Sequence, residues 1–412
     1  MNLQIDKNIL DAEVILEKDF KKAEEIALYN QNKVLQAFIK NKISSSHFSG
    51  TSGYGYDDIG REKLCKVFAD SFGAEDAIVS QAISCGSHAI TTVLFGLLRP
   101  NDLMLSITGK PYDTLDETIF GLESGEDNGS LKDYGVKYDE VDLVNNTDFN
   151  EEEILNKLKK VTPKIIYIQR SCGYLFRTAL EINKIEKIVS KIREVNKKSI
   201  IVVDNCYCEF VEDREPTEVG VDVAVGSLIK NPGGGLVSNG GYIVGKKEYI
   251  DWIAGRFTSP SLKMEVGSFE SGYRLVFQGL FLAPHTVLQA KKGSLLIGKV
   301  MQNLGYPIID NTNNLADIVR SVVFEDKDDL VNFCTSIQRM SPVDSFVTPI
   351  PSEMAGYDCE VVMSAGCFVQ GSTMELSCDS PLRKSPYVLY LQGGLTYEHI
   401  KLALNDYLVN RK

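Results

Sequence analysis

Three short stretches of the sequence place residues with useful chemistry directly after apolar runs. In "CGSHA", a glycine turn at Gly86 and Ser87 opens a helix and exposes backbone N–H groups, which suits a phosphate. "IIVVDN" ends in Asp204, a carboxylate that needs either solvent or a cationic partner. "VDVAVGSLIKNPGGG" delivers Ser227 and then Lys230, and a desolvated lysine has a lowered pKa and can form a Schiff base. Each stretch also has an ordinary alternative: a helix-capping serine, a turn-forming aspartate or a surface lysine.

Taken together, the three stretches match the needs of one cofactor. Pyridoxal phosphate requires a phosphate cup, an acid beside its ring nitrogen and a lysine for its aldehyde. Gly86, Ser87 and Ser227 would form the cup, and Asp204 would favour a proton on the ring nitrogen. Lys230 would bond to the aldehyde. The residues therefore predict a pyridoxal-phosphate site.

The elements that must position these residues alternate between short β-prone runs and helical ones from residue 61 onward. This alternation predicts an α/β fold with a mostly parallel sheet flanked by helices, in which ligands bind beyond the carboxyl ends of the strands. We expect N-terminal helices and a Gly/Tyr-rich loop over residues 1–60, a large α/β domain over 61–290 and a smaller α+β domain over 291–412. Pro284 predicts a break or kink in a long helix near the second boundary.

Composition excludes several other classes of protein. The chain has 412 residues, 43% of them hydrophobic, and a net charge of −12 with a pI near 5.0. Nucleic-acid binding is disfavoured because such proteins gather basic residues. We find no signal peptide or membrane span and expect a cytoplasmic protein. The nine scattered cysteines predict mostly buried thiols and neither a disulfide framework nor a metal site.

Longer motifs add a resemblance that covers residues 30 to 405. "SGYGYDDIGREKL", "SCGSHAI", "ITGKPYDTL", "DNCYCEFVE", "LIKNPGGGL" and "LQGGLTYEH" resemble those of methionine gamma-lyase-like proteins, also described as aluminium-resistance proteins or cystathionine beta-lyases. These are fold-type I pyridoxal-phosphate enzymes of the cysteine/methionine metabolism group. The resemblance implies that Lys230 carries the cofactor, that Asp204 faces the ring nitrogen and that Tyr112 or His88 stacks on the ring. It also implies a phosphate cup made by Cys85, Gly86, Ser87 and Ser227.

The resemblance further implies a homodimer or homotetramer with shared active sites, in which Tyr54, Tyr56 and Arg61 complete the phosphate site of a neighbouring subunit. The alternative for the tyrosines is ordinary loop packing. The arginine that this group uses for the substrate carboxylate is missing from "YVLYLQGG", so Arg383 is the nearest candidate unless it is simply a solvated loop residue.

The predicted activity is carbon–sulfur elimination from a sulfur-containing amino acid, of the methionine gamma-lyase or cystathionine beta-lyase type. Lys230 would act as the base, and Tyr56 or Tyr112 would protonate the leaving thiolate. The alternatives are an aminotransferase or aldolase-type enzyme with the same cofactor, or a ligand-binding protein without turnover.

Overall fold

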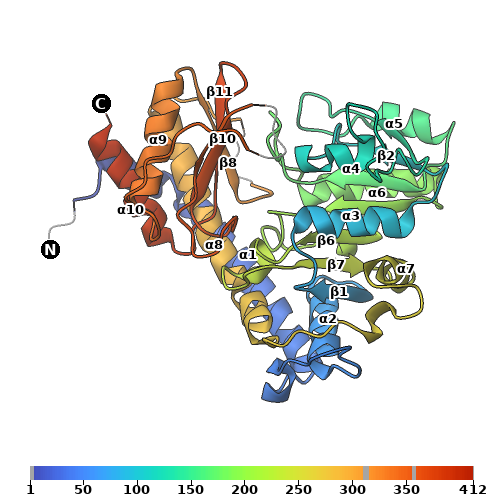
Figure 1. Ribbon diagram of the computed structural model, residues 1–412. Coiled ribbons are helices and arrows are strands. Elements are labelled where there is room, and N and C mark those ends of the chain that lie inside the picture. The colour runs from blue at the N-terminus through green and yellow to red at the C-terminus, as the bar shows by residue number, and fades with distance from the viewer. Residues whose placement is uncertain (1–3, 310–314, 355–358, 412) are drawn as a thin grey trace.

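The computed structural model describes residues 4–309, 315–354 and 359–411, which form two β-sheets connected by long helices (Figure 1). The larger sheet has seven strands in the order β1-β7-β6-β5-β4-β2-β3. β7 runs antiparallel to β1 and β6, whereas the other neighbouring pairs are parallel, so the predicted mostly parallel sheet is confirmed. The strands are β1 (Asp76–Ser80), β2 (Leu103–Ser106), β3 (Lys137–Glu140), β4 (Ile165–Gln169), β5 (Ile200–Asp204), β6 (Val223–Ser227) and β7 (Gly241–Gly245).

Helices cover both faces of this sheet, because its central strands are apolar on both sides. Along β5, Val202 packs in one apolar cluster with α3 and α7, and Val203 packs in another with α5 and α6. The apolar residues of α6 recur at helical spacing, which explains why this segment forms a helix with Ile185, Ile188 and Ile192 all buried. The helices of this part are α2 (Ile59–Ser71), α3 (Gly86–Leu97), α4 (Asp116–Phe120), α5 (Glu151–Leu158), α6 (Ile182–Val195) and α7 (Lys247–Phe257).

A four-stranded antiparallel sheet forms the second, smaller part, in the order β8-β11-β10-β9. Its register places Asp379 opposite Tyr390 and Ser377 opposite Gln392. Helices α9 and α10 pack against it in one apolar core. The elements are β8 (Val319–Phe324), α9 (Lys327–Arg339), β9 (Val361–Ser364), β10 (Ser377–Pro381), β11 (Tyr387–Gln392) and α10 (Tyr397–Asn410).

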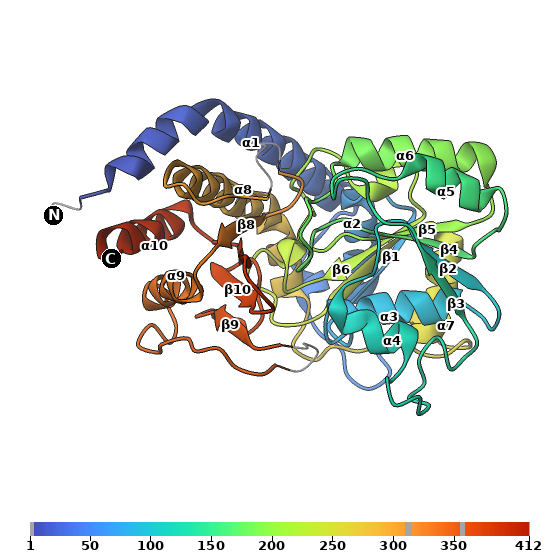
Figure 2. The ribbon, with the colours of Figure 1, turned by 90° about the horizontal axis from the view of Figure 1, so that it is seen from above.

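Two long helices, α1 (Lys7–Lys40) and α8 (Arg274–Asn303), run side by side along both parts of the molecule (Figure 2). α8 continues through Pro284 as one helix, so of the predicted break or kink the break is absent, and the kink stays a prediction. α1 contacts the larger part through Asn30, which donates to the carbonyl of Phe210 at 3.0 Å. At its other end, Glu13 accepts from Lys401 of α10 at 2.8 Å. Among the described residues, no helix combines the length and the apolar character that crossing a membrane requires.

Candidate active site

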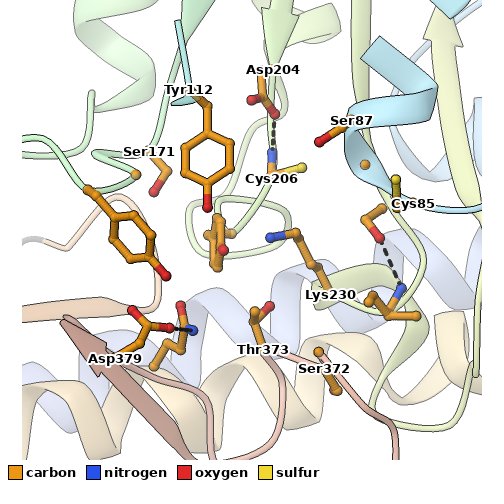
Figure 3. A pocket seen from close by; sticks show the side chains of 18 of the residues that line it. Cys85, Ser87, Tyr112, Ser171, Asp204, Cys206, Lys230, Ser372, Thr373 and Asp379 are labelled. Atoms are coloured by element: carbon orange, nitrogen blue, oxygen red, sulfur yellow. Dashed lines mark hydrogen bonds between the residues drawn. The ribbon is translucent and has the colours of Figure 1, made fainter. Parts of the chain in front are cut away.

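A cavity of about 300 Å³ lies where the carboxyl ends of β4, β5 and β6 face the smaller sheet (Figure 3). Gln169, Asp204 and Ser227 are the last residues of these three parallel strands. The cavity therefore lies where an open α/β sheet binds its ligands. Its lining also includes Cys85, Gly86, Ser87, Tyr112, Ser171, Tyr174, Cys206, Tyr207, Lys230, Ser372, Thr373, Ser377, Asp379 and Gln392.

Lys230 enters the cavity from a tight turn that follows β6. The turn is closed by residues Asn231–Gly233, and a Cβ on Gly233 would lie 1.7 Å from the carbonyl oxygen of Leu228, so only glycine fits. The Lys230 ammonium lies 3.4 Å from the centre of the Tyr207 ring. This cation–π contact holds the amine within the cavity.

The protonation state of Lys230 differs from the one expected from the sequence. Burial by itself lowers the pKa of the amine, but Tyr207, Cys206 and Asp204 outweigh burial, and the net pKa lies above its ordinary value. The prediction that the pKa of the Lys230 amine is lowered is therefore wrong for the protein without a bound ligand. Its own side chains keep Lys230 as an ammonium, because the desolvation cost is offset by nearby groups that favour the charge.

Asp204 lines the cavity, and 7% of its surface is exposed. Its carboxylate accepts from the backbone N–H of Cys206 at 3.1 Å (Figure 3). Burial raises the pKa of the carboxyl, although Cys206, Lys230 and Arg177 act in the opposite direction. A cationic ligand group placed beside Asp204 would relieve this cost of burial.

The N-terminus of α3 forms another wall of the cavity. Cys85 caps the helix, and its Sγ accepts from the backbone N–H of His88 at 3.4 Å. Cys85 is exposed, whereas seven of the nine cysteines are buried thiols, as predicted. A Cβ on Gly86 would contact Ser227 at 3.4 Å, so the glycine leaves space between the helix and β6. Free N–H groups at a helix start suit a phosphate.

Four polar atoms around the cavity are buried and have no hydrogen-bond partner among the described residues. They are Gln169 Oε1, Ser372 Oγ, Thr373 Oγ1 and Asp379 Oδ1. Most buried polar side-chain atoms in native proteins have a partner, which can be a protein group, an ordered water or a ligand, so these four atoms are available to a molecule bound in the cavity. A lysine, a buried acid and a helix N-terminus at the same cavity fit pyridoxal phosphate.

The structure brings most, but not all, of the predicted site residues into this cavity. Cys85, Gly86, Ser87, Tyr112, Asp204, Ser227 and Lys230 all line it. His88 does not, since its Nδ1 accepts from the backbone N–H of Ser84 at 3.1 Å and the ring lies outside the lining. Arg383 is also outside the lining and pairs with Asp113 at 3.0 Å.

The three residues predicted to serve a neighbouring subunit lie away from the cavity of their own chain. Tyr54 and Tyr56 are 66% and 57% exposed, and their rings stack at 5.3 Å. Arg61 is buried and donates to the carbonyls of Gly55 and Gly267 at 2.9 and 3.0 Å. Their role in another subunit's site stays a prediction.

Sequence reasoning missed Tyr207 and the cavity residues of the smaller sheet. Tyr207 has a φ of +72°, a left-handed conformation that a tyrosine rarely adopts. Such strained residues cluster at ligand sites. Its place three residues after Asp204 could have marked Tyr207 as a candidate cavity residue. The position of its ring, however, depends on this backbone conformation.

The fold and the cavity together define a fold-type I pyridoxal-phosphate-dependent enzyme. Two solved structures with 16% identity share the fold: the pyridoxal-5'-phosphate-dependent protein YhfS of Escherichia coli, with a TM-score of 0.60, and cystathionine gamma synthase of Xanthomonas oryzae, with a TM-score of 0.62. The first match covers 95% of this chain and 97% of the other, and the second covers 92% and 97%. The predicted fold class is confirmed.

Within that class, the chain belongs to the methionine gamma-lyase family, whose model matches residues 5–411. YnbB of Bacillus subtilis is 44% identical over 97% of this chain and 94% of its own. A carbon-sulfur lyase involved in aluminum resistance from Clostridium novyi NT is 42% identical, with a TM-score of 0.92 and coverage of 98% and 96%. Family membership confirms the predicted class of enzyme, a pyridoxal-phosphate-dependent carbon–sulfur lyase.

Proposed function

We propose that this protein eliminates a thiol from a sulfur-containing amino acid and that Lys230, Asp204 and the start of α3 hold the cofactor for this reaction. The observation that carries the proposal is the meeting of these three elements at one cavity with unpaired buried polar atoms. Bound there, pyridoxal phosphate supplies an electron-withdrawing ring that stabilises negative charge at the substrate α-carbon.

The chain's own residues have separate tasks in this proposal. Asp204 holds a proton at the ring nitrogen of the cofactor, because an adjacent anion favours the charged form. The backbone N–H groups of Gly86 and Ser87, together with the Ser227 hydroxyl, bind the phosphate. The Lys230 amine would hold the cofactor through its aldehyde and, as a free base, would remove the proton from the substrate α-carbon.

Tyr112 is the proposed proton donor to the leaving thiolate within the same chain. It lines the cavity, and its ring centre lies 5.9 Å from that of Tyr174. A tyrosine hydroxyl can both donate a proton and pack an aromatic face against a flat ligand. Tyr56 of a second subunit is the other candidate, because it is exposed in its own chain.

The activity is tested by incubating the purified protein with pyridoxal phosphate and a panel of sulfur amino acids. Release of thiol and ammonia with pyruvate indicates elimination at the β-carbon, and release with 2-oxobutyrate indicates elimination at the γ-carbon. Turnover that depends on an added keto acid would instead identify an aminotransferase. A protein that stays colourless after pyridoxal phosphate is added would contradict the proposal altogether.

Sharing of sites between subunits is tested by mixing two inactive variants, Lys230→Ala and Tyr56→Ala. If Tyr56 serves the partner's cavity, each mixed dimer contains one intact site, and random exchange restores roughly a quarter of the sites. Activity that stays at the sum of the two separate variants would show that Tyr56 has no role in a neighbouring site.

A further inference from the structure

The amine of Lys230 reaches into the cavity (Figure 3), where it lies on the face of an aromatic ring. Its nitrogen is 3.4 Å from the centre of the Tyr207 ring, well inside the distance of about 6 Å at which cation–π contacts act. Such a contact attracts a cation because the face of an aromatic ring is negative. It therefore favours the ammonium form of Lys230 over the neutral amine.

Tyr207 is held in place from both parts of the molecule. The backbone N–H of Ile318 donates to the Tyr207 carbonyl at 3.2 Å. Tyr207 also packs against an apolar cluster that includes Val319 of β8 and Tyr390 of β11. Its left-handed φ of +72° is a conformation that a tyrosine keeps only where its surroundings enforce it. The ring is therefore a fixed part of the cavity, on which the flexible lysine side chain comes to rest.

Several titratable groups besides Tyr207 surround this amine. From the larger part they are Cys85, Tyr112, Tyr174, Asp204, Cys206 and Glu209, and from the smaller sheet Asp379. All of them stay the same when only residue 207 is changed. A comparison of variants at position 207 therefore isolates the effect of the ring on the charge of Lys230.

The charge of Lys230 matters because only a neutral amine can bond to an aldehyde. The ammonium must first release a proton to solvent; the nitrogen electron pair then bonds to the aldehyde carbon, and the aldehyde oxygen leaves as water. A ring that stabilises the ammonium holds the side chain at the place of reaction but keeps it in the unreactive form. The contact thus acts before the cofactor is bound.

We propose that Tyr207 is a positioning residue that holds the Lys230 ammonium in the cofactor-free protein and so sets how fast, at a given pH, the lysine captures the cofactor. This inference rests on the proposed role of Lys230 at the cofactor aldehyde and adds a residue that controls it. Tyr207 acts through Lys230, and the face of its ring, not its hydroxyl group, carries the effect.

The test measures how fast the cofactor-free protein turns yellow with pyridoxal phosphate at pH 7.5. Tyr207→Leu removes the ring but keeps an apolar side chain. It should capture the cofactor about 10-fold faster than the wild type, because loss of a desolvated cation–π contact lowers the pKa of the amine by about one unit. Tyr207→Phe keeps the ring face and should stay within about threefold of the wild type.

A pair of rings with the same shape excludes a local distortion of the cavity. Tyr207→Phe is compared with the same substitution carrying three ring fluorines, which draw electron density from the face and weaken its attraction for a cation. The fluorinated ring should give capture about 10-fold faster than the plain one. Equal rates for the two rings, or a Tyr207→Leu protein no faster than the wild type, would overturn the inference.

Labelling of Lys230 by acetic anhydride, mapped by mass spectrometry, measures the same amine without the cofactor. Only the neutral amine is acylated, so Tyr207→Leu should again react about 10-fold faster than the wild type at pH 7.5. Tyr174→Leu is the matched control, because Tyr174 also lines the cavity but packs its ring 5.1 Å from that of Tyr390, and it should keep the wild-type rate.

The two measurements separate this inference from the proposed lyase function. A wild-type protein that never turns yellow refutes the proposed role of Lys230 at the cofactor, while faster labelling of Tyr207→Leu still supports the role of Tyr207. Equal labelling of all the proteins refutes the role of Tyr207 and leaves the lyase function intact.

Discussion

Replacement of Glu209 by glutamine should change how the stability of the protein depends on pH. Glu209 is completely buried beside the turn that carries Lys230, and its carbonyl accepts from the Asn231 side chain at 2.9 Å. Its Oε1 accepts from Tyr242 at 2.8 Å, whereas Oε2 has no partner among the described residues. Burial raises the pKa of this carboxyl from 4.5 to about 8.

The sign of the effect follows from this raised pKa. Between pH 4.5 and about 8 the folded protein holds a proton on Glu209 that the unfolded chain has lost. Its contribution to stability is therefore fully present below pH 4.5 and is lost as the pH rises through about 8. The pKa difference corresponds to about 5 kcal/mol in total, of which roughly 2–3 kcal/mol is lost between pH 6 and pH 9.

The measurement is the free energy of urea unfolding at pH 6 and at pH 9, at one fixed protein concentration, for the wild type and Glu209→Gln. The glutamine does not titrate, so the variant should gain roughly 2–3 kcal/mol relative to the wild type over this range. Other titrating groups are common to both proteins and cancel in the difference. Glu186→Gln, which removes an exposed partner of Arg214, is the control and should give no such change. If the free energies of unfolding of the wild type and Glu209→Gln differ by the same amount at both pH values, Glu209 is not a buried, protonated glutamate in the folded protein.

Three further predictions concern the site and its support. Lys230→Ala should remove the yellow absorbance of the bound cofactor while leaving the circular dichroism spectrum intact; a cofactor linkage that borohydride still traps would show that another lysine carries it. Asp204→Ala should keep the cofactor but lower turnover about 100-fold or more, and near-normal activity would exclude its role at the ring nitrogen. Gly226→Ala would place a Cβ 2.7 Å from both Glu209 and Tyr242 and should cost about 1–3 kcal/mol in urea unfolding, so an unchanged midpoint would argue against this close packing.

The part of the site that follows the parallel strands was predictable from the sequence. Ser227 and Asp204 end neighbouring strands of the same sheet, and the carboxyl ends of such strands share one edge. Gly86 and Ser87 were predictable because a glycine turn before an apolar helix exposes its first N–H groups. Lys230 follows from its position just after one of these strands.

The remainder depends on contacts that no local pattern records. Asp379 reaches the cavity from the smaller sheet, and the way two sheets pack together is a tertiary property. Tyr207 depends on an unfavourable backbone angle that the surrounding fold enforces. The contact between the Tyr207 ring and the Lys230 ammonium also explains why the predicted pKa of Lys230 was wrong, because the position of this ring could not be predicted from the sequence.

The position of α1 affects the order in which the protein can fold as it is synthesised. Ile9 and Ala12 of this helix lie in the same apolar core as Ile400 and Leu404 of α10. A chain emerging from the ribosome therefore makes the apolar face of its first helix long before that face has its partners. The core of the smaller part can be completed only once α10 is released, so the first turns of α1 lack some of their native apolar contacts during most of the synthesis.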